Sequence, residues 1–347
     1  MSLPIEPLIE LTGLRDREAM DAQLVRIVQQ TLRAETVRLQ RIVGDPGQER
    51  WLQAAWLQAG QSTEQADLHW VNLQQLPRLD SQPDWARCVR QATEVRLSGA
   101  GGTGHRLLMP LLSERGATGV LEVITGRPPS PSARRAVAGL LRIYHHLISL
   151  LDYSESDTLT GLLNRKSFDE AFYKASSLPL LERPGATGER RGLGEDRTMR
   201  YWLGVVDIDH FKMVNDQHGH LIGDEVLLLL SRVMRQSFRF LDKLYRFGGE
   251  EFVVLLRCES EADAIAAMER FRRNVEAYKF PRVLSVTVSI GLTDVRAGDT
   301  PPSAVERADL AVYYAKHHGR NQVRSHSTLV REGHLVDPAQ TGDVELF

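Results

Sequence analysis

The stretch RFGGEEF at residues 246–252 places two adjacent carboxylates, Glu250 and Glu251, directly after two glycines. Apolar residues that favour strands flank the stretch, and this pattern predicts a tight hairpin with the glycines in its turn. Because Gly248 and Gly249 have no Cβ, such a turn leaves room for a ligand as bulky as a phosphate. Neither a strand nor a turn needs adjacent glutamates in order to fold, so we interpret the two acids as groups that do chemistry.

A second group of acids lies upstream, in YWLGVVDIDHFKMVNDQHGHLIGDEVL at residues 201–227. The apolar strand predicted there ends in DID at residues 207–209, at the edge where α/β sheets usually bind ligands. Carboxylate oxygens suit Mg²⁺, and Lys212 could place a positive charge near a phosphate. Each feature alone is also typical of ordinary turns. If Glu250 faces Asp207 across the sheet, the pair could hold two metal ions about 4 Å apart, which would activate a hydroxyl and stabilise a leaving pyrophosphate.

Five motifs in a fixed order carry a resemblance to the GGDEF family of diguanylate cyclase domains, over about half of the chain. They are DTLTGLLNR (157–165), DIDHFKMVNDQHGHLIGD (207–224), RFGGEEF (246–252), VSIGL (288–292) and ADLAVYYAKHHGRNQV (308–323). The family condenses two GTP into cyclic di-GMP and releases two pyrophosphates. The resemblance therefore implies a GTP-consuming enzyme.

The resemblance also implies roles for individual residues. The catalytic residues would be Asp207, Lys212 and Glu250, and Lys212 would stabilise transition-state charge. The ligands of Mg²⁺, or of Mn²⁺, would be Asp207, the carbonyl of Ile208, Glu250 and Glu251. The substrate would be bound by Phe211, Asn215, His220, Asp224, Gly248, Gly249, Lys316 and Arg320. Lys316 and Arg320, four residues apart, would lie one helical turn from each other and clamp the β- and γ-phosphates.

Asp224 predicts the choice of base. Asn215 and Asp224 can hydrogen-bond along one edge of a base, and a carboxylate accepts two donors. Guanine supplies both donors through N1–H and N2–H₂, whereas adenine offers no such pair, and an unpaired buried carboxylate is costly. The sequence therefore favours GTP over ATP.

The segment RFLD at residues 239–242 places Arg239 and Asp242 three residues apart. On a helix this spacing is usually a surface ion pair. Its position before GGEEF matches the RxxD inhibitory site of the family, and by the same alignment Arg270 is the second arginine of that site. Arginine forks match guanine and phosphate bidentately, so the resemblance implies that cyclic di-GMP binds here as an inhibitor.

The implied reaction needs two chains. Each active site would hold one GTP, and the 3′-hydroxyl of each GTP must reach the α-phosphate of the other. An antiparallel homodimer is the natural arrangement for this.

The first 130 residues predict a mixed α/β domain. We expect a helix over residues 16–34, a strand in TVRLQRIVG, a helix around residues 51–56, and a hairpin over residues 105–124. This order resembles a GAF sensor domain, with a PAS-like domain as the rival, and implies an unknown ligand or signal. The tryptophans Trp51, Trp56, Trp70 and Trp85 could line a ligand cavity or pack in the core.

The sequence thus predicts an α/β (α+β) protein of two domains. The two domains are a GAF-like sensor domain (1–130) and a GGDEF domain with a central, mostly antiparallel sheet flanked by helices as in nucleotidyl cyclases (157–328). A helical linker (131–156) joins them, and a mobile tail (329–347) follows. Ser130 and Pro131 predict the start of the linker helix. Along it Ala136, Leu140, Ile143, Leu147 and Leu150 form either a short coiled-coil seam or the buried stripe of an ordinary amphipathic helix. Residues 178–200 predict a flexible excursion.

Composition excludes several classes of protein. The 347 residues carry a formal net charge of −2, which argues against a protein that binds duplex nucleic acid through bulk neutralisation of phosphates. No apolar run approaches the roughly 20 residues of a membrane span, and no secretory leader is evident, so we expect a cytoplasmic protein. Cys88 and Cys258 have no metal-site spacing, and we expect both to be buried thiols.

The rivals to an active cyclase are a non-catalytic receptor for cyclic di-GMP or GTP, and a scaffold that dimerises through the linker.

Overall fold

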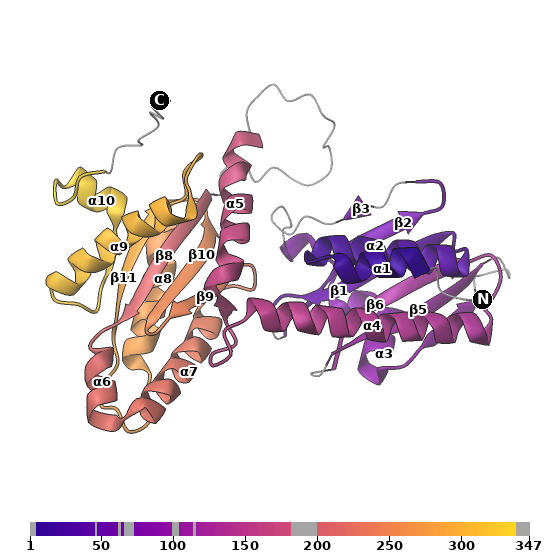
Figure 1. The fold of residues 1–347 in the computed structure, drawn as a ribbon, viewed down its shortest axis with the longest axis horizontal. Helices are drawn as coiled ribbons and strands as arrows, with labels where there is room; N and C mark the ends of the chain where they lie inside the picture. The colour runs from indigo at the N-terminus through magenta and orange to yellow at the C-terminus, as the bar shows by residue number, and fades with distance from the viewer. Residues whose placement is uncertain are drawn as a thin grey trace. The chain divides into compact units, whose positions relative to one another are not determined.

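The computed structural model describes residues 5–45, 47–61, 64–65, 73–98, 104–113, 116–181 and 200–337. The chain folds as two compact units, residues 1–154 and residues 155–347, which are described separately (Figure 1). No helix within these described ranges is both long enough and apolar enough to cross a membrane.

The N-terminal unit is built on one antiparallel sheet. Its strands are β1 (Thr36–Val43), β2 (Arg50–Gln58), β3 (Glu64–Gln65), β4 (Val95–Ser98), β5 (His105–Ser113) and β6 (Gly116–Thr125), in the spatial order β3-β2-β1-β6-β5-β4. Its helices are α1 (Ile5–Gly13), α2 (Arg17–Leu32), α3 (Pro83–Gln91) and α4 (Pro131–Glu155). Side chains alternate between the two sheet faces. Accordingly Leu121 and Val123 pack with α1, α2 and α4, whereas Val120 packs with α3 on the opposite face.

The helix predicted around residues 51–56 is wrong, because this segment is strand β2. The apolar spacing of Trp51, Leu52, Ala55 and Trp56 imitates a helix, but β2 pairs with β1 along its whole length. Both of its faces are covered, so apolar residues occur on both and the alternation typical of a strand is lost.

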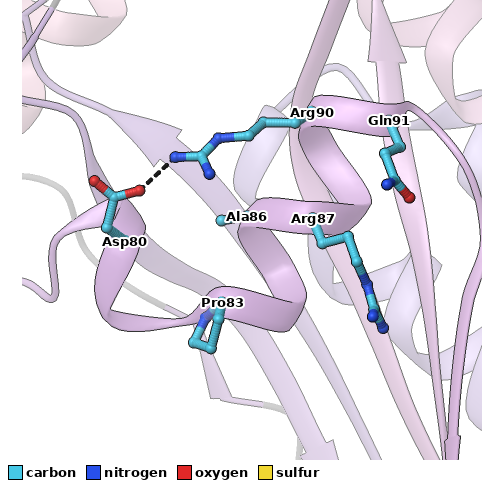
Figure 2. A pocket seen from close by; sticks show the side chains of 6 residues that line it. All are labelled: Asp80, Pro83, Ala86, Arg87, Arg90 and Gln91. Atoms are coloured by element: carbon cyan, nitrogen blue, oxygen red, sulfur yellow. Dashed lines mark hydrogen bonds and ion pairs between the residues drawn. The ribbon is translucent and has the colours of Figure 1, made fainter.

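Of the tryptophans that could have lined a ligand cavity, Trp51 packs in the core of the N-terminal unit. Trp51 is buried, its ring lies edge-on to Trp85 at a centroid distance of 5.4 Å, and its indole N–H donates to Leu79 O at 3.0 Å. Trp70 lies outside the described residues. A surface hollow of about 290 Å³ beside α3 is lined by Asp80, Pro83, Ala86, Arg87, Arg90 and Gln91, with an ion pair between Asp80 and Arg90 (Figure 2). This hollow has no tryptophan in its lining.

Helix α4 begins as predicted: Ser130 Oγ accepts from Ala133 N at 3.2 Å, with Pro131 in the first turn. Its stripe of buried residues differs from the predicted seam, because Ile143 is 36% and Leu150 is 65% exposed. The buried residues are Ala133, Val137, Leu140, Leu141, Tyr144, Ile148 and Leu151. Residues 131–154 thus pack as an amphipathic helix on the N-terminal unit, and the boundary between the two units lies at the end of α4.

The C-terminal unit has a central sheet covered on both faces. Its elements are β7 (Leu163–Asn164), α5 (Arg165–Leu181), β8 (Arg200–Ile208), α6 (Phe211–His218), α7 (His220–Ser237), β9 (Lys243–Gly248), β10 (Glu251–Cys258), α8 (Glu261–Ala277), β11 (Val288–Asp294), α9 (Pro301–His317), β12 (Val323–Ser325) and α10 (His326–Arg331). The order is β12-β11-β8-β10-β9-β7, antiparallel except at the two outer pairs. The prediction of a mostly antiparallel sheet is confirmed.

Helices α6, α7 and α8 cover one face of this sheet, and α5 and α9 cover the other (Figure 1). Gly291 in β11 permits the close approach of α9, because a Cβ at this position would lie 2.0 Å from Ala308 O. Cys258 is half-buried against the first of these layers, and Cys88 is buried in the N-terminal unit; both are free thiols.

The prediction of a mobile tail from residue 329 is wrong for residues 329–337. Leu329 is 1% exposed, and Asp337 accepts from Arg296 Nη1 at 2.9 Å, so residues 329–337 belong to the C-terminal unit. The prediction fails because the short helix α10, which carries Leu329, packs against α9 and β11. Most of the predicted 178–200 excursion, and residues 338–347, lie outside the described residues.

Candidate functional site

Asp207 lies at the end of the central strand β8. In the sheet it is the direct neighbour of Glu251 on β10 and of Ser289 on β11. The odd-numbered positions of β8 face α5 and α9, and Lys316 near the end of α9 places its Nζ 2.7 Å from Asp207 Oδ1. The strand register therefore brings the DID motif and the GGEEF motif together, but Glu251, and not Glu250, lies directly opposite Asp207.

Both glycines of the GGEEF turn have a backbone conformation that favours glycine. Gly248 has φ +146° and Gly249 has φ +49°, which L side chains rarely adopt, and a Cβ at either position would meet nothing within 4 Å. The turn is open on this side, as expected for a site that admits a phosphate. A register shift between Glu251 and Phe252 gives the turn its local irregularity.

A salt bridge that sequence reasoning missed fixes this turn. Arg246 donates to Gly249 O from both Nε (3.1 Å) and Nη2 (2.9 Å), and its Nη1 lies 3.1 Å from Asp157 Oδ1. Asp157 also accepts from the Thr160 backbone (2.8 Å) and hydroxyl (2.7 Å). Both residues lie in motifs that are visible in the sequence, because Asp157 begins DTLTGLLNR and Arg246 begins RFGGEEF. What could not be read from the sequence was that Asp157 and Arg246 form a pair.

We expect Asp157→Asn to destabilise the C-terminal unit by about 1–3 kcal/mol at pH 7, as for hydrogen bonds to a charged group. Burial opposes ionisation of Asp157, but hydrogen bonds from Thr160 and Arg246 outweigh it and hold the pKa below its ordinary value. A lowered pKa in the folded state gives stability that is present above the ordinary Asp pKa of about 3.9 and is lost as the pH falls from that value through the lowered pKa of the folded state.

Thermal unfolding from pH 7 to pH 3 tests this expectation. The gap in stability between the wild type and Asp157→Asn should narrow as the pH falls below about 4. Asp169→Asn, at an exposed position on α5, is the control. A gap that is constant down to pH 3 would contradict the assigned charge on Asp157.

The carboxylates around the turn repel one another. Burial, followed by the charges of Glu251 and Asp209, raises the pKa of Asp207, while Lys316 opposes this shift. Burial and the charge of Asp207 also raise the pKa of Glu250. A divalent cation would relieve this repulsion. Within the described residues, no three Asp, Glu, His or Cys side chains converge as a ready metal cage. Divalent cations bind carboxylate oxygens together with phosphate oxygens and water, so the donor set of these acids fits such an ion.

Asp309 on α9 was missed by sequence reasoning. Burial, then the charges of Glu251 and Asp207, raises the pKa of Asp309 to about 6, although the residue keeps considerable contact with solvent. Lys316 lies seven residues further along the same helix, which is two turns and therefore the same face. This spacing of seven residues is the feature of the sequence that could have indicated that Asp309 lies on the same face of the helix as Lys316.

The predicted nucleoside residues lie on the helical hairpin α6–α7. Phe211 is 5% exposed and belongs to the core rather than to an open surface. Asn215 packs against α7 at Gly223, where a Cβ would lie 1.9 Å from Asn215 Oδ1. The other three residues, Lys212, His220 and Asp224, are exposed.

One prediction at this site needs correction. Arg320 is not one helical turn from Lys316, because α9 ends at His317 and Arg320 follows in a left-handed turn with φ +56°. Glycine and asparagine favour positive φ, and their presence at residues 319 and 321 is the feature of the sequence that indicates the end of the helix. Asp209, the second acid of the DID motif, was assigned no role, and its carboxylate accepts hydrogen bonds from Thr287, Ser289 and Asn321.

The residues of the predicted inhibitory site are neighbours at the end of α7. Arg239 N donates to Asp242 Oδ2 at 2.9 Å, and Arg270 on α8 donates to Ser237 O at 2.8 and 3.2 Å. Burial raises the pKa of Asp242, although Arg239 and Arg270 oppose the shift. Asp242 thus holds a turn in the backbone, a role that the sequence did not indicate.

The fold and the site together define an α/β domain that gathers acids and a lysine around a glycine turn at the end of its central strand. Residues 193–322 match the family described as "Diguanylate cyclase, GGDEF domain". The chain is 38% identical over 183 residues to diguanylate cyclase DgcP of Pseudomonas aeruginosa, covering 52% of this chain and 25% of that protein. It is 36% identical over 206 residues to the response regulator PleD of Caulobacter vibrioides, covering 58% of this chain and 42% of that protein. The chain thus spans less than half the length of these two relatives.

Among solved structures, the GGDEF domain of DgcB from Caulobacter crescentus, in complex with c-di-GMP, is similar at 31% identity with a TM-score of 0.42. The match covers 50% of this chain and 96% of that one. Diguanylate cyclase SiaD from Pseudomonas aeruginosa, in complex with its activator SiaC, is similar at 33% identity with a TM-score of 0.46, covering 56% of this chain and 70% of that one. Residues 193–322 of the chain therefore form a GGDEF domain.

Proposed function

We propose that the protein is a Mg²⁺-dependent diguanylate cyclase that condenses two GTP into cyclic di-GMP and releases two pyrophosphates. The observation that carries the proposal is the meeting of Asp207 with the GGEEF turn, beside Lys316, at the end of the central strand. The sequence relatives named as diguanylate cyclases support it.

In this proposal Asp207, the carbonyl of Ile208, Glu250 and Glu251 hold Mg²⁺ or Mn²⁺. Bound there, the metal would lower the pKa of the ribose 3′-hydroxyl and neutralise the charge on the phosphates. Lys316, which pairs with Asp207 in the structure, would exchange that carboxylate for phosphate oxygens, and Arg320 would bind the phosphates beside it.

The remaining residues of the site bind and orient GTP. Asn215 and His220 would hold the guanine and the ribose, while Asp224 accepts the two guanine donors and so favours GTP over ATP. Lys212 would stabilise the charge that develops on the α-phosphate. Gly248 and Gly249 leave the open backbone across which the triphosphate lies.

Two copies of the chain must cooperate in this reaction. Each domain would supply one bound GTP, and a homodimer with the two sites face to face would bring each 3′-hydroxyl to the other α-phosphate. We assign the N-terminal unit a sensory role, of the GAF or PAS type, on the order of its elements, with its signal acting on how often the two sites meet.

Product inhibition forms part of the proposal. Arg239, Asp242 and Arg270 lie together near the end of α7, and two arginine side chains there could receive the guanine and phosphate groups of cyclic di-GMP.

Incubation of the purified chain with GTP and Mg²⁺, followed by chromatography of the nucleotides, tests the function. We expect one cyclic di-GMP for every two pyrophosphates, no product when a chelator removes the metal, and no comparable turnover of ATP. Absence of cyclic di-GMP at micromolar protein would overturn the proposal. Binding of labelled cyclic di-GMP or GTP without turnover would instead support the alternative of a non-catalytic receptor.

A further inference from the structure

The turn that follows α9 has a demanding backbone. Gly319, Arg320 and Asn321 all have positive φ, at +103°, +56° and +45°. For a residue with a Cβ the left-handed region costs roughly 1–2 kcal/mol, and asparagine tolerates it better than most. Arg320 has no such tolerance, so its conformation must be held by the contacts of its neighbours.

Asp209 supplies the first of these contacts. Its carboxylate is 6% exposed and accepts from Thr287 Oγ1 at 2.7 Å, Ser289 Oγ at 2.7 Å and Asn321 N at 3.0 Å. One buried carboxylate therefore joins the beginning of β11 to the turn that carries Arg320. Asp209 is also two residues from Asp207, so the same short segment carries the proposed metal ligand and this anchor.

The Asn321 side chain supplies the second contact. Its Oδ1 accepts from Arg272 Nη1 at 2.8 Å and its Nδ2 donates to Glu276 Oε1 at 2.7 Å, both on α8. Arg272 donates in turn to Glu276 at 2.8 Å and to Glu269 at 2.9 Å, and its side chain is only 12% exposed. The asparagine is thus held from both sides by a preassembled ionic group.

Backbone hydrogen bonds fix the turn before and after Asn321. Arg320 N donates to Ala315 O at 3.0 Å, and Ile290 N donates to Gln322 O at 2.9 Å. The Gln322 side chain donates to Ala315 O in the last turn of α9 and to O of the C-cap residue His318, at 2.8 and 2.7 Å. By contrast, the Arg320 side chain is exposed. The rigid backbone thus presents this guanidinium to solvent.

We propose that Asp209 and Asn321, with Arg272 and Glu276 behind them, form a bracket that positions Arg320 to bind the terminal phosphates of the nucleotide. This inference rests on the proposed function. The bracket residues are positioning residues and touch no substrate. Their effect is preorganisation, because a long arginine side chain on a fixed backbone loses less freedom when it binds phosphate.

The effect of the bracket on nucleotide affinity distinguishes it from a general stabilising role. Loss of the bracket should weaken the binding of terminal phosphates, whereas the guanine and ribose contacts from α6 and α7 should be unaffected. A purely structural role would weaken the binding of all nucleotides equally, or of none.

Asn321→Gly is the direct test, since glycine keeps the positive φ and removes only the side-chain contacts. Calorimetry with 3′-deoxy-GTP, which cannot condense, should show a dissociation constant raised about tenfold, or about 1.4 kcal/mol. The dissociation constant of GMP, which lacks the terminal phosphates, should change by about twofold or less. Asn274→Ala is the matched control, because it removes a hydrogen bond from α8 to Ser237 Oγ, 2.8 Å long, without touching the turn.

Rescue adds a second measurement. Asn321→Asp alone sets a carboxylate against Glu276 and should weaken 3′-deoxy-GTP binding. Combining it with Glu276→Gln restores a donor and should return the dissociation constant to within about threefold of the wild type. Equal losses of GMP and 3′-deoxy-GTP affinity in Asn321→Gly, or no loss of either, would overturn the bracket. A wild-type chain that binds neither nucleotide would instead overturn the proposed function.

Discussion

Replacement of Glu250 by glutamine should lower the rate of cyclic di-GMP formation by about 1,000-fold or more, a loss of roughly 4 kcal/mol of transition-state stabilisation. Glutamine keeps the size of the side chain and removes its negative charge, which the proposed metal site needs next to Asp207. The loss should fall mainly on kcat rather than on KM, because the phosphate and guanine contacts come from other residues.

The fold should tolerate this change. Burial and the charge of Asp207 raise the pKa of Glu250, so ionisation of this side chain costs the folded state some stability. A raised carboxyl pKa means that ionisation above the ordinary value lowers stability, and a neutral glutamine removes that loss. The melting temperature at pH 7 should therefore be equal to that of the wild type or slightly higher.

Glu259→Gln gives the control for Glu250→Gln. Glu259 is exposed and follows the opposite end of β10 from the GGEEF turn, so the same change of charge there should leave turnover unaltered. Retention of more than about a tenth of wild-type activity by Glu250→Gln would contradict the assigned role, since loss of an essential charged group costs far more than that.

The sequence was sufficient to predict the part of the site that depends on short-range order. The glycine turn of GGEEF and the strand that carries Asp207 near its end each follow from local pattern, whereas the register of β8 and β10, which places Glu251 rather than Glu250 opposite Asp207, does not. The roles assigned to these residues in binding and catalysis stay predictions.

The errors arose where tertiary contacts override a local pattern. Trp51 to Trp56 have helical spacing, but β1 pairs with the segment and a strand forms. On α4, Ile143 and Leu150 fit a heptad pattern, but the side chains that pack in the core with the sheet residues lie on an adjacent face of the helix. The partners of Asp157 and Asp209 lie far away in sequence, 89 residues for Arg246 and 112 for Asn321, and no local rule could have paired them.

Replacement of Arg239 by alanine should raise the inhibition constant for cyclic di-GMP by about tenfold or more, the loss expected when a charged bidentate donor is removed. The structure makes this test specific to the side chain. The contact from Arg239 to Asp242 uses the backbone N–H, at 2.9 Å, and the backbone is retained in alanine. The turn should therefore keep its shape, and the initial rate at low product should stay within about twofold of the wild type.

Arg273→Ala on α8 controls for the loss of one positive charge, because its side chain is 73% exposed and its contact to Glu269 is 3.7 Å long. This variant should be inhibited like the wild type. Asp242→Ala should act differently from Arg239→Ala, because it removes the side-chain oxygen that accepts from Arg239 N and so disturbs the backbone at Arg239. If Arg239→Ala leaves the inhibition constant unchanged, RFLD is a structural turn at the end of α7, and product inhibition, where observed, acts through another surface.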